Sequence, residues 1–234
     1  MRKYLKMLKP LSTRVIKSLA SSMVKMLPSN LRWSQTQAAY VDWASKPLDE
    51  TYLEFIRRRG AMFADFVGEP GIIIDVGCGN GVIGGMTYAE SGYTPLRRGR
   101  YPIYGIDPLP LKAPIPWLNF YNQIKCEDVD QTTMHAEVAT FITTFDHIEN
   151  PETALMKLSK IGVKKIYLWE TLWIRPVNGD WYHSHRYTYP QLEKILEKAD
   201  YSIIRSVRVD ATRDTEGWFI EADKNEEFGY QWRN

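Results

Sequence analysis

The sequence predicts a single α/β domain built on a doubly wound, mostly parallel sheet of seven strands. An antiparallel strand is expected at the edge of the sheet, and helices are expected at the N-terminus. Short apolar runs rich in β-branched and aromatic residues recur from residue 72 onward. Helical or long connections separate the first five runs, as parallel strands require. The last two runs lie close together, which favours an antiparallel pair at the edge.

The strands are predicted from these runs in chain order. The first run, IIIDV, is continuously apolar before its acid, as expected for a strand buried on both faces. A helix is predicted at 49–66 from its apolar positions, and another at about 189–199 between the fifth and sixth strands. The predicted strands are 72–76, 101–107, 117–124, 138–144, 164–170, 201–209 and 217–223.

Length and composition fit one globular domain with a sizeable core. The chain has 234 residues, of which 44% are hydrophobic and 25% are charged. The two cysteines, Cys78 and Cys126, show no metal-ligand spacing and make a poor disulfide framework, so a reducing, cytoplasmic setting is expected. The net charge of +2 and the lack of a basic recognition domain argue against nucleic acid as a partner.

The first 48 residues differ from the rest in charge, because no acidic residue precedes Asp42. The spacing of the apolar residues puts them on one face of a helix over 4–27, which Pro10 interrupts. This segment fits a helix packed on the domain, a peripheral membrane helix or a transit peptide. The expected organisation is a basic segment or lid at 1–48, the ligand-binding domain at 49–225 and a polar tail at 226–234. The apolar face consists of Tyr4, Leu8, Leu11, Val15 and Leu19.

The segment IIIDVGCGNGVIGG (72–85) predicts a nucleotide-binding turn. A buried strand reaches Asp75, and glycines then follow at positions 77, 79 and 81. Glycine allows the backbone to approach a ligand closely and to adopt positive φ angles. Open α/β sheets bind ligands at the carboxyl ends of their strands, and Asp107 at the end of the next strand can accept two ribose hydroxyls. Gly79-x-Gly81-x-x-Gly84 also fits a dinucleotide fingerprint, so a nicotinamide cofactor is an alternative at this point.

Two motifs together resemble the class I S-adenosylmethionine-dependent methyltransferases, whose fold is Rossmann-like. Asp75-Val76-Gly77-Cys78-Gly79-Asn80-Gly81 is similar to the family's acidic-x-Gly-x-Gly-x-Gly loop, and TTFDHIENPETALMKL (143–158) to its fourth motif. The resemblance covers roughly residues 50–223 and implies S-adenosylmethionine as cofactor and S-adenosylhomocysteine as product. The nicotinamide alternative explains neither Asp75 nor the FDHIENP turn.

The resemblance also implies which residues contact the cofactor. The loop would wrap the methionine part, and Asp107 would hold the ribose. An acid after the third strand usually contacts the adenine amine, and in IKCEDVD (124–130) either Glu127 or Asp128 can take this position. The expected cofactor-binding residues are Asp75, Gly77, Cys78, Gly79, Gly81, Asp107, Pro108, Glu127, Asp128, Thr143 and Thr144.

Histidines are the candidates for a general base, because an alcohol or phenol acceptor must lose its proton and imidazole titrates near neutral pH. His147 follows the fourth strand beside Asp146, and His183 and His185 flank Ser184 after the fifth strand. Residues two apart in an extended segment point the same way, so this pair is also compatible with a metal. A lone pair of histidines is weak support for one, and no metal site is expected. His135 is expected to be structural.

The acceptor is expected to be a small molecule or a glycan, methylated at oxygen. Aromatic residues and Glu170 near the predicted cleft suit a sugar or a planar acceptor. Three arginines at 97, 98 and 100 form either a solvated loop or a clamp for a phosphate or carboxylate. A protein or nucleic-acid methyltransferase and a non-catalytic cofactor-binding subunit are the alternatives. The aromatic residues are Trp169, Trp173, Trp181, Tyr182, Tyr187 and Tyr189.

Overall fold

The computed structural model describes residues 48–68, 70–89, 102–110, 114–132, 134–177 and 183–225, together with Val41. Most of the predicted N-terminal segment, the arginine cluster at 97–100, Trp181, Tyr182 and the tail at 226–234 lie outside these residues. The predictions made for them, and the domain boundaries that they define, stay predictions.

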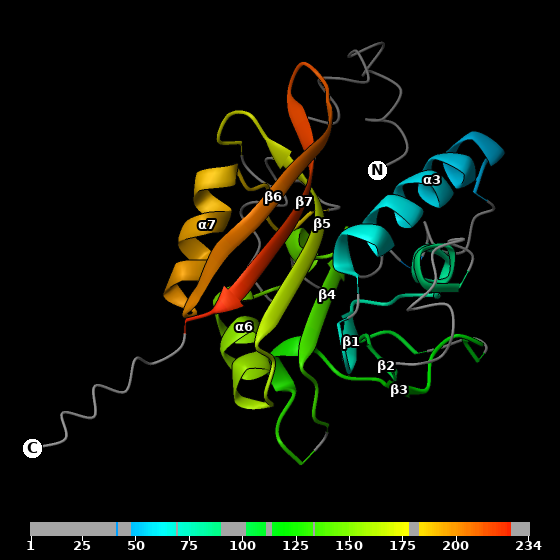
Figure 1. Cartoon of the computed structure of the whole chain (residues 1–234), viewed down its shortest axis with the longest axis vertical. Helices are drawn as coiled ribbons and strands as arrows, with labels where there is room; N and C mark the ends of the chain where they lie inside the picture. The colour runs from blue at the N-terminus through cyan, green and yellow to red at the C-terminus, as the bar shows by residue number, and fades with distance from the viewer. Residues whose placement is uncertain are drawn as a thin grey trace, which may run out of the picture.

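The described residues form one seven-stranded sheet in the order β3-β2-β1-β4-β5-β7-β6 (Figure 1). Each predicted run of the sequence contains one strand, although the third is much shorter than expected. The strands are β1 (Ile73–Val76), β2 (Ile103–Ile106), β3 (Phe120–Asn122), β4 (Val138–Ile142), β5 (Lys165–Trp173), β6 (Tyr201–Ala211) and β7 (Thr215–Lys224).

The sheet consists of two halves that both begin next to β1: β2 and β3 lie on one side of it, and β4, β5, β7 and β6 lie on the other. β1 pairs in parallel with β2 on one side and with β4 on the other. β5 extends the parallel part, and β7 pairs antiparallel with both β5 and β6. The doubly wound sheet and its antiparallel pair at the edge are therefore confirmed. A sheet that reverses at β1 opens a crevice beside the carboxyl end of that strand.

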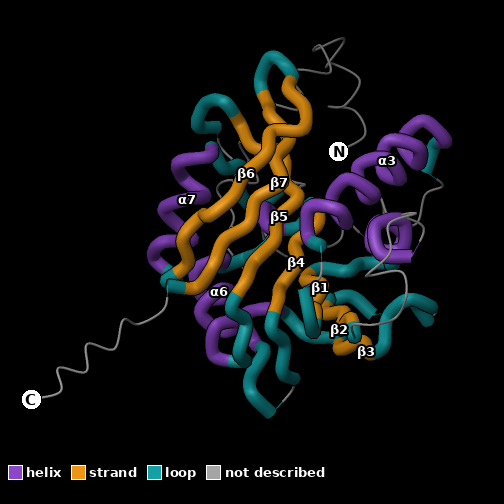
Figure 2. Tube along the Cα trace, in the orientation of Figure 1, coloured by secondary structure: helices purple, strands orange, loops and turns teal. Residues whose placement is uncertain are grey.

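Alternate strand residues supply two separate cores, one on each face of the sheet. Ile74, Ala139 and Leu168 face helices α6 (Pro151–Lys160) and α7 (Tyr189–Lys198). Ile73 and Val138 face helix α3 (Glu50–Val67) on the opposite side. Figure 2 shows α6 and α7 on one side of the sheet and α3 on the other. Helices on both faces bury all of β1 and β4 and the middle of β5, which explains why these strands are mostly apolar.

Local sequence signals fix where these helices begin. The Asp49 side chain caps α3 by accepting the Tyr52 N–H at 2.8 Å. The Asn150 side chain caps α6 by accepting the Thr153 N–H at 3.0 Å, and Pro151 occupies the first turn of that helix. Each side chain satisfies a backbone donor that the helix itself leaves open. The cap of α6 also fixes the end of the loop that carries His147.

The helix after the glycine loop is irregular. It consists of a single turn, α4 (Val82–Gly84), continued by a π-helical turn, η1 (Gly85–Ala89). α3 packs closely here, because a Cβ on Gly60 would lie 2.8 Å from Thr87 Oγ1. None of the helices in the described residues is long and apolar enough to cross a membrane.

Candidate active site

The glycine loop turns sharply at the carboxyl end of β1. Gly77, Gly79 and Gly81 have φ angles of 69°, 55° and 80°, a conformation that residues with side chains rarely adopt. A Cβ on Gly77 would overlap the Cγ2 atom of Thr144. Backbone conformation therefore favours glycine at all three positions, and contact with the turn that follows β4 also requires it at Gly77.

Asp107 at the end of β2 holds the loop from the neighbouring strand. Its carboxylate accepts the Gly79 N–H at 2.9 Å and the Leu109 N–H at 2.8 Å. Burial raises the pKa of Asp107, although the two N–H donors oppose that effect. The carboxyl ends of β1 and β2 are therefore adjacent, as the sequence predicted. Asp107 and Pro108 both line the cavity.

Asp75 belongs to a buried polar cluster beneath the loop. Thr140 donates to its Oδ1 atom at 3.0 Å and Tyr88 at 3.3 Å, and the two hydroxyls lie 2.6 Å apart. Burial raises the pKa of Asp75 to about 7, against the effect of these two hydrogen bonds. A carboxyl group that titrates near neutrality at the wall of a cavity is typical of a functional site.

The turn after β4 adopts a strained conformation. Thr143 has a φ of 53°, and its N–H donates to the Trp169 carbonyl at 2.7 Å. Positive φ is costly for threonine and persists only where neighbouring groups enforce it. Glu170 enforces it here by accepting the N–H groups of Thr144 at 2.8 Å and Phe145 at 2.7 Å. Burial raises the pKa of Glu170 well above its usual range, and the nearby charge of Asp146 adds to this.

Three polar side chains meet beyond this turn. Nε2 of His147 lies 3.5 Å from one carboxylate oxygen of Asp146, and Nε2 of His183 lies 3.7 Å from the other. The two imidazole rings are 5.0 Å apart between centroids and inclined by 31°. The structure therefore brings His183 to His147, 36 positions earlier in the chain, and not to its sequence neighbour His185.

His185 faces another direction, contrary to the expectation that it points the same way as His183. Its ring stacks on Tyr187 with centroids 5.2 Å apart, and its Nε2 lies 3.3 Å from the Glu149 carbonyl. Its N–H donates to the Asp146 carbonyl at 3.0 Å. Backbone pairing with Asp146 turns the segment, so the alternation of an extended strand does not apply. His135 contacts the Ile161 carbonyl at 2.9 Å, outside the cavity.

The two acids predicted as alternatives after β3 differ in their position relative to the cavity. Glu127 lines the cavity, and its side chain accepts the Asn150 N–H at 2.9 Å. Asp128 is exposed and lies outside the cavity. The short 3-10 turn η2 (Cys126–Asp128) separates them by turning Asp128 outward. Lys125 and Glu149 form an ion pair of 3.1 Å at the same end of the cavity.

One cavity of about 490 Å³ extends from the glycine loop to His147 and His183. Its volume lies within the range of small-molecule and cofactor sites. Near one end it is lined by Asp75, Gly77, Cys78, Asp107, Pro108 and Glu127, together with Thr143 and Thr144. Gly79 and Gly81 do not line it and shape the turn instead. Asn80, Ile83 and Lys125 also line the cavity, although they are not among the predicted cofactor-binding residues.

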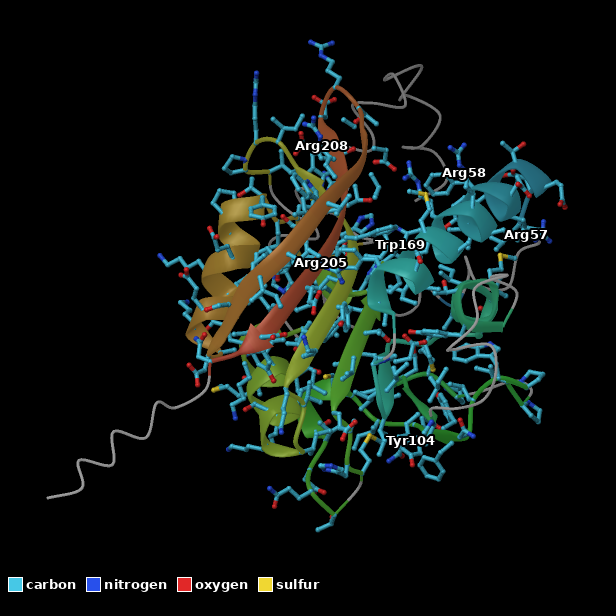
Figure 3. The ribbon with its side chains drawn as sticks, viewed as in Figure 1. Arg57, Arg58, Tyr104, Trp169, Arg205 and Arg208 are labelled. Carbon is cyan, nitrogen blue, oxygen red and sulfur yellow. The ribbon has the colours of Figure 1, made fainter. Side chains whose placement is uncertain are left out.

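The cavity wall also includes aromatic side chains and the two histidines. Tyr52 and Phe55 from α3 stack on each other with centroids 6.4 Å apart. Trp169 and Thr171 on β5 face the same space as His147 and His183. Figure 3 shows Trp169 where the sheet meets α3. Glu170, predicted to contact an acceptor, is 3% exposed, and its carboxylate holds the turn after β4 instead.

No protein-family model matches the chain, and no curated protein matches it in sequence. Several solved structures do match the chain. 1,6-Didemethyltoxoflavin-N1-methyltransferase from Burkholderia thailandensis, solved with its substrate and S-adenosylhomocysteine, has a TM-score of 0.62 and 14% identity over 86% of this chain and 92% of that one.

Two further structures show the same architecture. Magnesium protoporphyrin IX methyltransferase from Synechocystis, with bound S-adenosylhomocysteine, has a TM-score of 0.51 and 12% identity over 91% of this chain and 99% of that one. The fold is that of the class I methyltransferases. The [4+2]-cyclase SpnF also has this fold, with a TM-score of 0.57 and 14% identity over 72% of this chain and 81% of that one. Methyltransferase folds therefore also carry other chemistry, and the activity of this chain must be argued from its own residues.

Proposed function

We propose that the chain binds S-adenosylmethionine and transfers its methyl group to an oxygen of a small molecule or saccharide. The observation that carries this proposal is the continuity of one cavity from the glycine loop to the imidazoles of His147 and His183. A donor and an acceptor bound at its two ends would meet inside it. The methyltransferases of similar fold whose structures hold S-adenosylhomocysteine support the choice of cofactor.

The residues at the loop end fit this cofactor. Asp107 and Glu127 both line the cavity; Asp107 would accept the ribose hydroxyls, and Glu127 would accept the adenine amine. Asp75 supplies negative charge for the cationic methionine part, beside the close backbone approach that Gly77 allows. When bound, this cofactor supplies a methyl group on a sulfonium centre, so the leaving group needs no further activation.

The chain must then orient the acceptor and remove its proton. Nδ1 of His147 is buried, so Nε2 is the nitrogen that can face an acceptor hydroxyl. The Asp146 carboxylate, 3.5 Å from this Nε2, stabilises the imidazolium that forms when the proton is taken. Tyr52, Phe55 and Trp169 provide apolar faces on which a sugar or planar acceptor can stack.

A first experiment addresses the cofactor alone. Calorimetric titration with S-adenosylhomocysteine, NAD and NADP should show micromolar binding of S-adenosylhomocysteine only. Binding of a nicotinamide nucleotide instead would overturn the assignment of the loop. Transfer of a labelled methyl group to a panel of phenols, hydroxy acids and saccharides then tests the reaction, which a protein that only binds the cofactor would not catalyse.

The base is tested by matched histidine variants. His147→Ala should retain S-adenosylhomocysteine affinity while losing about 100-fold or more in turnover, as expected for a general base. His135→Ala removes an imidazole outside the cavity and should keep full turnover, and His185→Ala should do so if its protein folds normally. Normal turnover of His147→Ala would contradict the assignment of the base, and His183→Ala would then identify the alternative.

A further inference from the structure

The cluster of Asp146, His147 and His183 has the composition of a metal centre. One carboxylate oxygen and the two imidazole nitrogens all lie within 4.8 Å of one another. Two histidines and one carboxylate form a common set of ligands for divalent transition metals, and their mixed nitrogen and oxygen donors disfavour magnesium and calcium. Residue spacing did not predict this site, because His147 and His183 are 36 positions apart in the chain.

The distances within the cluster fit shared ligation. Metal bonds of about 2.0–2.2 Å place neighbouring tetrahedral ligands about 3.3–3.5 Å apart. The Nε2 atoms of His147 and His183 lie 3.5 and 3.7 Å from the oxygens of Asp146, so shifts of a few tenths of an ångström would bring them to this spacing. The two imidazole rings are inclined to each other, and the Nε2 atom of each ring lies near the Asp146 carboxylate.

Backbone contacts position the ligands before any ion arrives. The His185 N–H holds the Asp146 carbonyl, and the His147 N–H donates to the Thr144 carbonyl at 2.9 Å. Glu170 holds the two N–H groups that precede Asp146. Such fixed surroundings reduce the cost of assembling a metal site. Both histidines also line the cavity, so an ion would have access to solvent and an open coordination position.

We propose that Asp146, His147 and His183 bind one divalent transition-metal ion, such as Zn²⁺ or Co²⁺, at the acceptor end of the cavity. The ion would use Nε2 of His147, which is also the atom proposed as the base. Metal binding and proton removal by His147 therefore exclude each other, and an ion at this position inhibits methyl transfer. The binding itself is independent of the proposed function, and only the inhibition rests on it.

Titration of the full chain with Co²⁺, followed by visible absorption, tests the site directly. One equivalent should bind per chain and be displaced by Zn²⁺. His183→Ala should weaken Co²⁺ binding at least about 100-fold, since even the loss of a residue that only supports a ligand costs 10–100-fold. His135→Ala, which removes a histidine outside the cluster, should bind Co²⁺ like the wild type. Wild-type affinity in His183→Ala, or no saturable spectrum in the wild type, would overturn the site.

A second measurement separates this inference from the proposed function. Asp146→Asn removes the shared carboxylate charge and should also weaken Co²⁺ binding, and its S-adenosylhomocysteine affinity reports whether it folds. Zn²⁺ at a concentration that saturates the site should lower methyl transfer, and a chelator should restore it. Saturable Co²⁺ binding together with faster turnover would support the site but contradict the assignment of His147 as base.

Discussion

The Glu170 carboxylate accepts the N–H of Phe145 at 2.7 Å, and so ties β5 to the turn that follows β4. The same oxygen accepts the Thr144 N–H at 2.8 Å. This turn carries the strained Thr143, presses Thr144 against Gly77 and leads directly to Asp146 and His147. One buried carboxyl group therefore fixes both the wall of the proposed cofactor site and the direction of the proposed base.

Replacement of Glu170 should consequently affect stability according to whether an acceptor oxygen remains. Glu170→Ala leaves two buried N–H groups without a partner and should cost about 2 kcal/mol or more in the free energy of unfolding. Glu170→Gln keeps an amide oxygen for them and should lose much less. Urea denaturation of both variants measures the difference. Equal losses would contradict this account, because Glu170→Gln creates no cavity and keeps an acceptor oxygen for both N–H groups.

The strands of the sheet follow from signals that are local in the sequence. Ile73, Ile74 and Val76 form an apolar run ahead of the glycines, and the same pattern recurs in β4 and β5. Burial on both faces demands such runs, so the sheet and its winding could be predicted. Asp75 and Asp107 could be predicted for the same reason, because each stands at the carboxyl end of its strand.

The acceptor end depends on contacts that no local pattern encodes. Asp146 meets His183 only because the chain after β5 folds back over the turn after β4. His185 departs from extended alternation because its N–H pairs with Asp146. The position of Tyr52 and Phe55 at the cavity depends on how α3 crosses the sheet. These relationships are tertiary, so residue spacing could not reveal them.

Gly77→Ala should abolish S-adenosylhomocysteine binding. The substitution forces alanine into a φ of 69° and drives its Cβ into Thr144. Gly68→Ala is a matched control, because Gly68 has a φ of 68° but nothing within 4 Å of its Cβ position. Both variants should lose about 1–2 kcal/mol of stability from backbone strain, with Gly77→Ala losing more. Calorimetry should find normal cofactor affinity in Gly68→Ala alone, and unchanged affinity in Gly77→Ala would refute the role of the loop.

Asp107→Ala should weaken S-adenosylhomocysteine binding by about 1.5–3 kcal/mol, the value of hydrogen bonds to a charged group. It also removes the acceptor for the Gly79 and Leu109 N–H groups, so some loss of stability should accompany it. Asp107→Asn keeps one oxygen for these donors and separates the two effects. If Asp107→Asn is stable but binds as weakly as Asp107→Ala, the carboxylate itself recognises the cofactor. Full affinity in both would remove Asp107 from the cofactor site.

The pKa of Asp75, raised to about 7 by burial, predicts how stability depends on pH. The unfolded chain binds this proton only below about pH 4, whereas the folded chain keeps it up to about pH 7. Folding is therefore favoured by protonated Asp75, and this contribution is lost as the pH rises from about 4 to 7. Above that window the folded chain carries a buried carboxylate at a cost in stability.

Asp75→Asn removes this cost while keeping an oxygen for Thr140 and Tyr88. The variant should be more stable than the wild type at about pH 8.5, and the difference should shrink to near zero only at about pH 4, where the carboxyl is protonated in the folded chain and largely protonated in the unfolded one. Its affinity for S-adenosylhomocysteine should fall, since the amide offers no charge to the ligand's ammonium group. Urea denaturation at both pH values and calorimetry test this. A stability difference that is the same at both pH values would mean that Asp75 does not titrate in this window.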